Sequence, residues 1–274
     1  MTNLAYKYGM SYSKPNVTLL QESGIGVSEI ASRTAYDSFN KSENECICNA
    51  TKSLDINAIN SIESSDLLHS LAWVNHHHSV LEHTSLSFLI EGTSRGVLQE
   101  HARHRIQAIT VRSTRYTMSS VINAFIAFSK VSFIDKVLSF DMLVTTDTEY
   151  NRLEIGVMYD KLMLQFIKLG HEEFYKVAVA KSSLPIISSS KDANELFKAL
   201  EAGKKKRNVG DAFKHIVTDN WKVDMVVTFN LRSLKNYFDL RDSGASYFQI
   251  QWLAKAIKEA TPNKYLTLIV KENK

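Results

Sequence analysis

The sequence has few of the residues that interrupt regular structure or cross-link a chain. Among its 274 residues there are only 3 Pro and 10 Gly, which favours long regular elements, mostly helices. The 2 Cys, Cys46 and Cys48, are too few for a disulfide scaffold or for a cysteine-based zinc site. No apolar run approaches the roughly 20 residues of a transmembrane helix, and the polar, aromatic start of the chain does not resemble a secretory signal. We therefore expect a cytoplasmic protein with no membrane partner.

The composition is that of a folded globular chain. Apolar residues make up 44% and charged residues 23%, which excludes a disordered or collagen-like protein. The length suits one large domain, and we expect a single domain over residues 1–274. The net charge of +4 is a mild surplus that suits an anionic ligand but does not demand a nucleic acid.

Apolar periodicity predicts the α+β class, rich in helix with a small sheet. Strands are expected over 84–91, where Leu86, Phe88 and Ile90 alternate with polar residues, and over 221–230. Residues 41–57 are expected to form a loop, and 76–83 an irregular turn. Serines are expected to cap three helices: Ser28, then Ser64 or Ser65, then Ser94. Helices are predicted over 26–39, 66–75, 94–105, 150–169, 172–180, 192–202, 232–239 and 246–259.

Arginines are concentrated in one short segment. Arg103-His104-Arg105 is followed by Arg112, Ser113, Arg115 and Tyr116. Guanidinium groups bind phosphates and carboxylates in a bidentate manner, so the segment predicts an anion pocket, most simply for a nucleotide phosphate. The alternative is that these cations only complement the carboxyl end of the preceding helix.

A second polar segment begins at Asn230 and ends at Arg241. On a helix Arg232, Asn236 and Leu240 are four residues apart and share one face. Amide and guanidinium groups at the junction of a strand and a helix can bind the heteroatoms of a ring system. The alternative is an ordinary charged helix with asparagine at its start.

Other motifs compete with this interpretation. Seven histidines lie between residues 69 and 104, but they match no zinc-site spacing, so no metal is expected. Gly92-Thr93-Ser94-Arg95-Gly96 fits the pattern of a nucleophile elbow, and a serine hydrolase would add Asp160 with His171 or His215. We favour a simple turn there. A nucleic-acid-binding module built on the arginine segment and the basic run 204–207 is disfavoured, because few aromatic residues accompany these cations.

Three ordered segments resemble flavin-dependent thymidylate synthases. The first is Arg103-His104-Arg105, then seven residues, then Ser113 and Arg115-Tyr116. Upstream, residues 77–83 read HHSVLEH and resemble the family's H-x-[ST]-x-x-E-H turn. Downstream, residues 230–241 read NLRSLKNYFDLR and resemble its N-x-R-S-L-x-N-x-x-x-L-R segment.

The resemblance implies a homotetramer of α+β subunits, each with a small, mostly antiparallel sheet and FAD bound at subunit junctions. It implies reductive methylation of dUMP to dTMP, with methylenetetrahydrofolate as carbon donor and NADPH as reductant. Hydroxymethylation of a pyrimidine nucleotide on the same fold stays open as an alternative. The flavin route needs no cysteine nucleophile, in keeping with a chain whose only two thiols lie in an acidic segment. Residues 117–148 and 182–210 are expected to be elaborations of the family fold.

The resemblance also implies roles for particular residues. Arg241 is implied as the catalytic residue that contacts the uracil edge and favours ionisation at N3. Glu100 stands where the family often has Gln, and Val111 can offer only its backbone. Lys214 is preferred over Lys181 as a late cation for dUMP. The implied FAD-binding residues are Ser38, His77, Ser79, Glu82, Arg103, His104, Arg105, Ile106, Asn230, Leu231, Arg232, Asn236 and Leu240. The implied dUMP-binding residues are Glu100, His101, Ala102, Arg103, Val111, Arg112, Ser113, Thr114, Arg115, Lys214 and Arg241.

Overall fold

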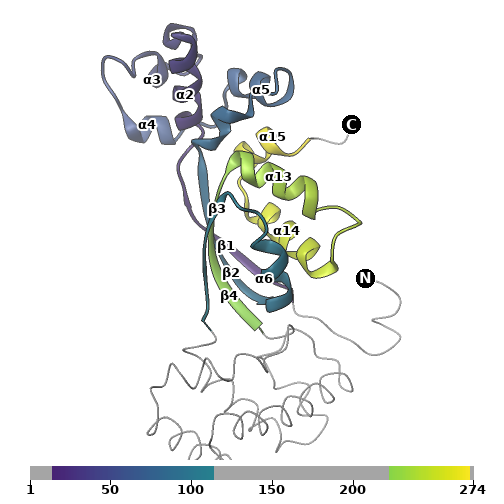
Figure 1. Cartoon of the computed structure of the whole chain (residues 1–274). Coiled ribbons are helices and arrows are strands. Elements are labelled where there is room, and N and C mark those ends of the chain that lie inside the picture. The colour runs from purple at the N-terminus through teal and green to yellow at the C-terminus, as the bar shows by residue number, and fades with distance from the viewer. Residues whose placement is uncertain (1–13, 114–221, 272–274) are drawn as a thin grey trace, which may run out of the picture. The chain divides into compact units, whose positions relative to one another are not determined.

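The computed structural model describes residues 14–113 and 222–271 (Figure 1). Most of them belong to one compact unit, made of residues 14–93, 97–111 and 224–274. A second unit comprises residues 1–13, 94–96 and 112–223, and nearly all of it lies outside the described ranges. The helices predicted between 150 and 202 and the two expected elaborations therefore fall outside the description.

A four-stranded sheet lies at the centre of the described unit (Figure 1). Its strands are ordered β1-β2-β4-β3. Strand β1 is antiparallel to β2, with Asn16 opposite Glu91, and β3 is antiparallel to β4, with Gln107 opposite Phe229. The four strands are β1 (Asn16–Glu22), β2 (Ser85–Ser94), β3 (Gln107–Val111) and β4 (Lys222–Asn230).

Two hydrogen bonds give the direction of the central pair, β2 and β4. The hydroxyls of Ser87 and Thr228 are 2.8 Å apart, and the backbone N–H of Gly92 donates to Asp224 Oδ1 at 2.9 Å. As residue numbers rise along β2 they fall along β4, so this pair is also antiparallel. The predicted small antiparallel sheet is confirmed.

The alternation predicted for the strands is confirmed where the chain is described. In β2 the side chains of Leu86, Phe88 and Ile90 are buried, and in β4 the buried side chains recur at every second residue. The expected end of the strand at Gly92 is wrong. Gly92 takes a positive φ of 76°, which glycine tolerates, and its N–H is paired with Asp224, so β2 continues to Ser94.

Helix α2 (Gly26–Tyr36) ends earlier than predicted. Asp37 adopts a left-handed conformation with φ 45°, and its N–H bonds back to carbonyls of the last turn, which closes the helix. The predicted cap is also wrong, since Ile25 is at that position. Ser28 is buried instead, and its hydroxyl lies 2.7 Å from that of Thr84.

Between α2 and β2 the chain is more regular than the predicted loop. The helix capped by Ser65 is confirmed as α5, because the Ser65 hydroxyl accepts from the N–H of Leu68. The predicted turn at 76–83 contains a 3-10 helix. These elements are η1 (Phe39–Lys41), α3 (Glu45–Cys48), α4 (Ile56–Asn60), α5 (Asp66–Trp73) and η2 (His78–Glu82).

After β4 three helices follow, where two were predicted. The third, which was not predicted, starts directly after Pro262, its N-cap. Helix α14 packs against β1 and α13 (Figure 1). Helix α13 also packs against η2. Among the described residues, no helix combines the length and apolar character that crossing a membrane demands. The helices are α13 (Leu231–Arg241), α14 (Phe248–Ala260) and α15 (Asn263–Ile269).

Candidate functional site

Helix α13 divides its residues between the core and a pocket. The Asn230 side chain accepts from the N–H of Ser233 at 2.8 Å, which fixes the start of the helix at the end of β4. The buried residues of α13 are Leu231, Leu234, Tyr237 and Phe238. Its pocket-lining residues are Arg232, Ser233, Lys235, Asn236, Asp239, Leu240 and Arg241. The predicted sharing of one face by Arg232, Asn236 and Leu240 is thereby confirmed.

The arginine triplet lies in the connection after α6 (Arg95–His101). The expected continuation of this helix to residue 105 is wrong. The N–H groups of Arg103 and His104 bond to carbonyls three residues earlier, which tightens and ends the helix. Arg103, His104, Arg105 and Ile106 consequently lie on an irregular segment that leads into β3, where all four line the pocket.

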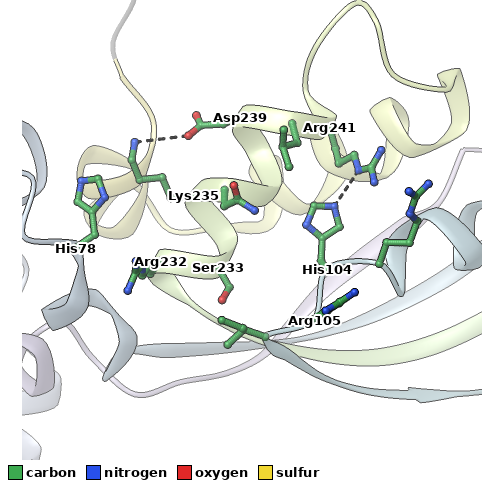
Figure 2. Close-up of a pocket in the computed structure, with 12 residues that line it drawn as sticks. His78, His104, Arg105, Arg232, Ser233, Lys235, Asp239 and Arg241 are labelled. Atoms are coloured by element: carbon green, nitrogen blue, oxygen red, sulfur yellow. Dashed lines mark hydrogen bonds and ion pairs between the residues drawn. The ribbon is translucent and has the colours of Figure 1, made fainter.

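The pocket has a volume of about 890 Å³, within the range of about 300–1,000 Å³ usual for ligand sites. Figure 2 shows the residues after α6 facing α13 across it. Four arginines and one lysine line this space, together with a single carboxylate, that of Asp239. The lining therefore favours an anionic ligand.

Arg241 is held by several contacts with the α6 side of the pocket. Its Nε donates to His104 Nε2 at 2.9 Å, as Figure 2 shows. Its Nη1 lies 3.1 Å from Glu100 Oε2, and Arg103 lies 3.5 Å from the other oxygen of that carboxylate. Glu100 thus balances two cations at the edge of the pocket.

Two histidines beside Arg241 are kept neutral. Burial lowers the pKa of His104, and the Arg241 guanidinium lowers it further. Burial lowers the pKa of His101 to about 4, and the neighbouring His104 and Arg241 act in the same direction. Because an arginine Nε–H can only donate, His104 Nε2 must accept, which requires the neutral ring.

The low pKa of His101 predicts a loss of stability in acid. The unfolded chain binds this proton near pH 6.5 and the folded chain only near pH 4, so acidification across that window favours unfolding by roughly 3 kcal/mol. Urea unfolding at pH 7 and pH 4.5 measures the effect. The His101→Asn variant has no group to titrate there and should show a shallower dependence on pH; equal slopes for the two proteins would contradict the prediction.

The opposite end of the pocket joins α13 to the preceding helices. Arg232 forms an ion pair with Glu82 of η2, a residue 150 positions away in sequence. Lys235 lies over the ring of Trp73, with Nζ 4.1 Å from the ring centroid. The same Nζ is 4.0 Å from Asp239 Oδ2, a contact that Figure 2 shows. These contacts fix the pocket face of α13 relative to η2 and α5.

The family model described as thymidylate synthase complementing protein, Thy1, matches residues 19–264. The chain belongs to the Thy1 family.

Relatives agree with this assignment. A flavin-dependent thymidylate synthase of Wolinella succinogenes is 25% identical over 254 residues, 91% of this chain and 94% of that protein. One from Campylobacter jejuni is 26% identical over 249 residues, 91% of this chain and 93% of that protein. The crystal structure of thymidylate synthase X from Helicobacter pylori with FAD and dUMP is similar with a TM-score of 0.59 and 25% identity, over 93% of this chain and 97% of that one.

The pocket contains many of the residues that the Thy1 resemblance implied, from both segments. Four more lining residues were not predicted: His78, Ser233, Lys235 and Asp239. Their spacing on α13 could have indicated Ser233, Lys235 and Asp239, because each is three or four residues from an implied residue. His78 is bound at Nε2 to the Ala72 carbonyl at 3.0 Å, a contact that no local pattern indicates.

Other implied residues lie outside the pocket lining. Glu82 and Glu100 contact lining arginines, and His77 Nδ1 lies 3.0 Å from the Tyr36 hydroxyl. His101, like Leu231, turns its side chain into the core. Thr114, Arg115, Lys214 and Lys181 fall outside the described residues. The rest lie elsewhere and stay predictions as ligand contacts: Ser38, Ser79, Ala102, Val111, Arg112, Ser113 and Asn230.

The competing motifs gain no support from the structure of this Thy1 chain. Ser94 is only 1% exposed, whereas a nucleophile elbow presents its serine to substrate. Asp160, His171 and His215 fall outside the description. Within residues 14–113 and 222–271, no three His, Cys, Asp or Glu side chains are grouped so that they could hold a metal ion.

Proposed function

We propose that this chain is a flavin-dependent thymidylate synthase that converts dUMP to dTMP. Methylenetetrahydrofolate would supply the carbon, FAD would carry the hydride and NADPH would reduce the flavin. One observation carries the proposal: Arg103-His104-Arg105 and the Arg232–Arg241 face of α13, remote in sequence, line one pocket. Membership of the Thy1 family and the relatives' shared activity support it independently.

The donor set of the pocket fits FAD. Guanidinium groups suit its pyrophosphate, and the exposed amide of Asn236 suits the heteroatoms of its rings. Among the lining residues, Arg103, His104, Arg105, Arg232, Asn236 and Leu240 would hold the cofactor. When bound, FAD supplies the hydride chemistry, which no side chain of a protein can provide.

Arg241 is suited to hold the substrate base. Its guanidinium is fixed by His104 and Glu100, so it can stabilise charge that develops on the uracil ring without first reorganising. The Glu100 carboxylate already contacts Nη1 of this guanidinium, so bound dUMP would replace that contact or share Nη1 with it. Arg103, whose side chain is 74% exposed, is available at the rim for a phosphate.

The purified protein is expected to be yellow, because bound oxidised flavin absorbs visible light. NADPH should bleach the colour and air should restore it. With dUMP and methylenetetrahydrofolate present, mass spectrometry should detect dTMP. A colourless protein that binds no added FAD would contradict the proposal. A hydroxymethylated nucleotide as the only product would show that the enzyme hydroxymethylates dUMP instead of methylating it.

A homotetramer, a cytoplasmic location and one family domain across residues 1–274 complete the proposal. Matching of the Thy1 model to residues 19–264, across both compact units, supports the single family domain. Light scattering after size-exclusion chromatography measures the assembly: a mass four times the chain's 31.0 kDa is expected, and a monomer would contradict it.

A further inference from the structure

A polar pair is buried beneath the pocket. His101 Nδ1 lies 3.1 Å from the hydroxyl of Tyr237, and neither side chain has exposed surface. Both rings also pack on Phe229, whose centroid is 5.7 Å from that of His101 and 5.3 Å from that of Tyr237. Burying two polar side chains is costly unless they are hydrogen-bonded, so each of these residues depends on the other.

Tyr237 connects this pair to the pocket. Its ring meets that of His104 edge to face, with centroids 4.7 Å apart and planes at 63°. His104 Nε2 in turn accepts from Arg241 Nε at 2.9 Å. An unbroken series of contacts therefore runs from the buried His101 to the guanidinium in the pocket.

The series matters because of how a guanidinium is oriented. Glu100 holds the two terminal nitrogens of Arg241, with its carboxylate 3.1 Å from Nη1 and its backbone carbonyl 3.4 Å from Nη2, and His104 holds Nε. Contacts on both sides fix the position and the plane of the group. If the His104 ring turned, only the contacts with Glu100 would remain, and the Nε side of the guanidinium could tilt.

We propose that His101 and Tyr237 are positioning residues for Arg241. Their hydrogen bond sets the orientation of the Tyr237 ring, and that ring sets the angle at which His104 accepts from Arg241. Only the catalytic role of Arg241 rests on the proposed function. The geometry of the series does not depend on it.

A purely space-filling role for His101 makes a different prediction. Asn can place an amide where Nδ1 of histidine lies, whereas Gln is longer, closer to histidine in size, and reaches the position of Nε2. Among the described residues His101 Nε2 makes no well-formed hydrogen bond, although the side chain of Gln107 also interacts with the ring and raises its pKa. Our proposal therefore expects His101→Asn to retain function better than His101→Gln, and a space-filling role expects the reverse order.

Crystal structures and kinetics of the full-length variants test the proposal. Tyr237→Phe removes only the hydroxyl, and the Arg241–His104 contact is expected to be lost or displaced. The value of kcat/KM for dUMP should fall about ten- to a hundred-fold, as for other small misplacements of a reacting group. Tyr265→Phe is the matched control, since Tyr265 is equally buried but lies on α15, and among the described residues its ring contacts neither His101 nor His104. This control should leave the Arg241–His104 contact and the kcat/KM for dUMP unchanged.

The outcomes separate this proposal from the proposed function. An unmoved Arg241 in the Tyr237→Phe crystal structure overturns the proposal whether or not the protein makes dTMP. Equal kinetic losses in Tyr237→Phe and Tyr265→Phe, or better activity in His101→Gln than in His101→Asn, also overturn it. A displaced Arg241 in Tyr237→Phe, found together with a wild-type protein that lacks synthase activity, leaves the positioning role standing and refutes only the function.

Discussion

Replacing Arg241 with Ala is expected to lower kcat for dTMP formation by about a hundred- to a thousand-fold. The side chain is held on two sides, by His104 and by Glu100, so its charge is already in place when charge develops on the base. Reduction of the bound flavin by NADPH needs no dUMP and should proceed nearly unchanged. Steady-state rates of dTMP formation and stopped-flow flavin absorbance measure the two steps separately.

Two further variants make the Arg241 result specific. Arg241→Lys keeps the charge but loses the planar fork, and should recover little of the rate. Lys258→Ala removes a cation near the end of α13, where Nζ lies 3.1 Å from Asp242 Oδ2, outside the pocket lining. It should keep normal kinetics. Normal dTMP formation by Arg241→Ala would show that Arg241 is not a catalytic residue.

Replacing Glu29 with Ala is expected to lower the free energy of unfolding by about 3–5 kcal/mol. Glu29 is fully buried on α2 and forms an ion pair with Arg33, which is also buried, at 3.2 Å. Its carboxylate also accepts from the Ser42 hydroxyl and, at 3.0 Å, from the Asn44 amide. Removing it leaves the buried Arg33 with the partly exposed Glu43, 3.5 Å away, as its remaining carboxylate, and it takes one acceptor from Ser42 and one from Asn44.

Urea unfolding of Glu29→Ala, beside a control variant that changes an exposed carboxylate, measures the predicted loss in the free energy of unfolding. Glu45→Ala changes a carboxylate on the neighbouring α3 that is exposed, and should shift stability by less than about 0.5 kcal/mol. Arg33 also donates to the Ser38 carbonyl at 3.4 Å, so the Glu29 variant should disturb an implied flavin contact. Similar stabilities for the two variants would mean that water enters and solvates Arg33 at little cost.

The sequence predicted elements whose evidence lies within a few residues. Alternation in β2 and β4 and the start of α13 at Asn230 follow from local patterning and capping, and the structure agrees. Strand β1 was not predicted, because its alternation covers only a few residues before the register shifts between Leu19 and Gln21. Ser28 was misassigned because its hydroxyl bonds with Thr84, a partner 56 residues away.

The same distinction applies to the site. Local motifs sufficed to select the arginine segment and the polar face of α13, because their residue types and spacing already limit the chemistry. Contacts across the pocket could not be predicted: the Glu82–Arg232 ion pair joins residues 150 positions apart, and Lys235 rests on Trp73. Nor did the sequence indicate that His101 would turn inward, since that depends on where α6 ends.

The strand order of the sheet has a consequence for how the chain folds. Asn16 and Glu91, partners in β1 and β2, are 75 residues apart, and Ser87 and Thr228, partners in β2 and β4, are 141 apart. Pairs this distant must bear the entropy of closing long loops before they gain any contact. High contact order slows folding, so the helices should form in an early kinetic phase and the sheet in a late one. The pocket, which needs β4 to place α13 opposite the arginine segment, would then be among the last parts of the molecule to mature.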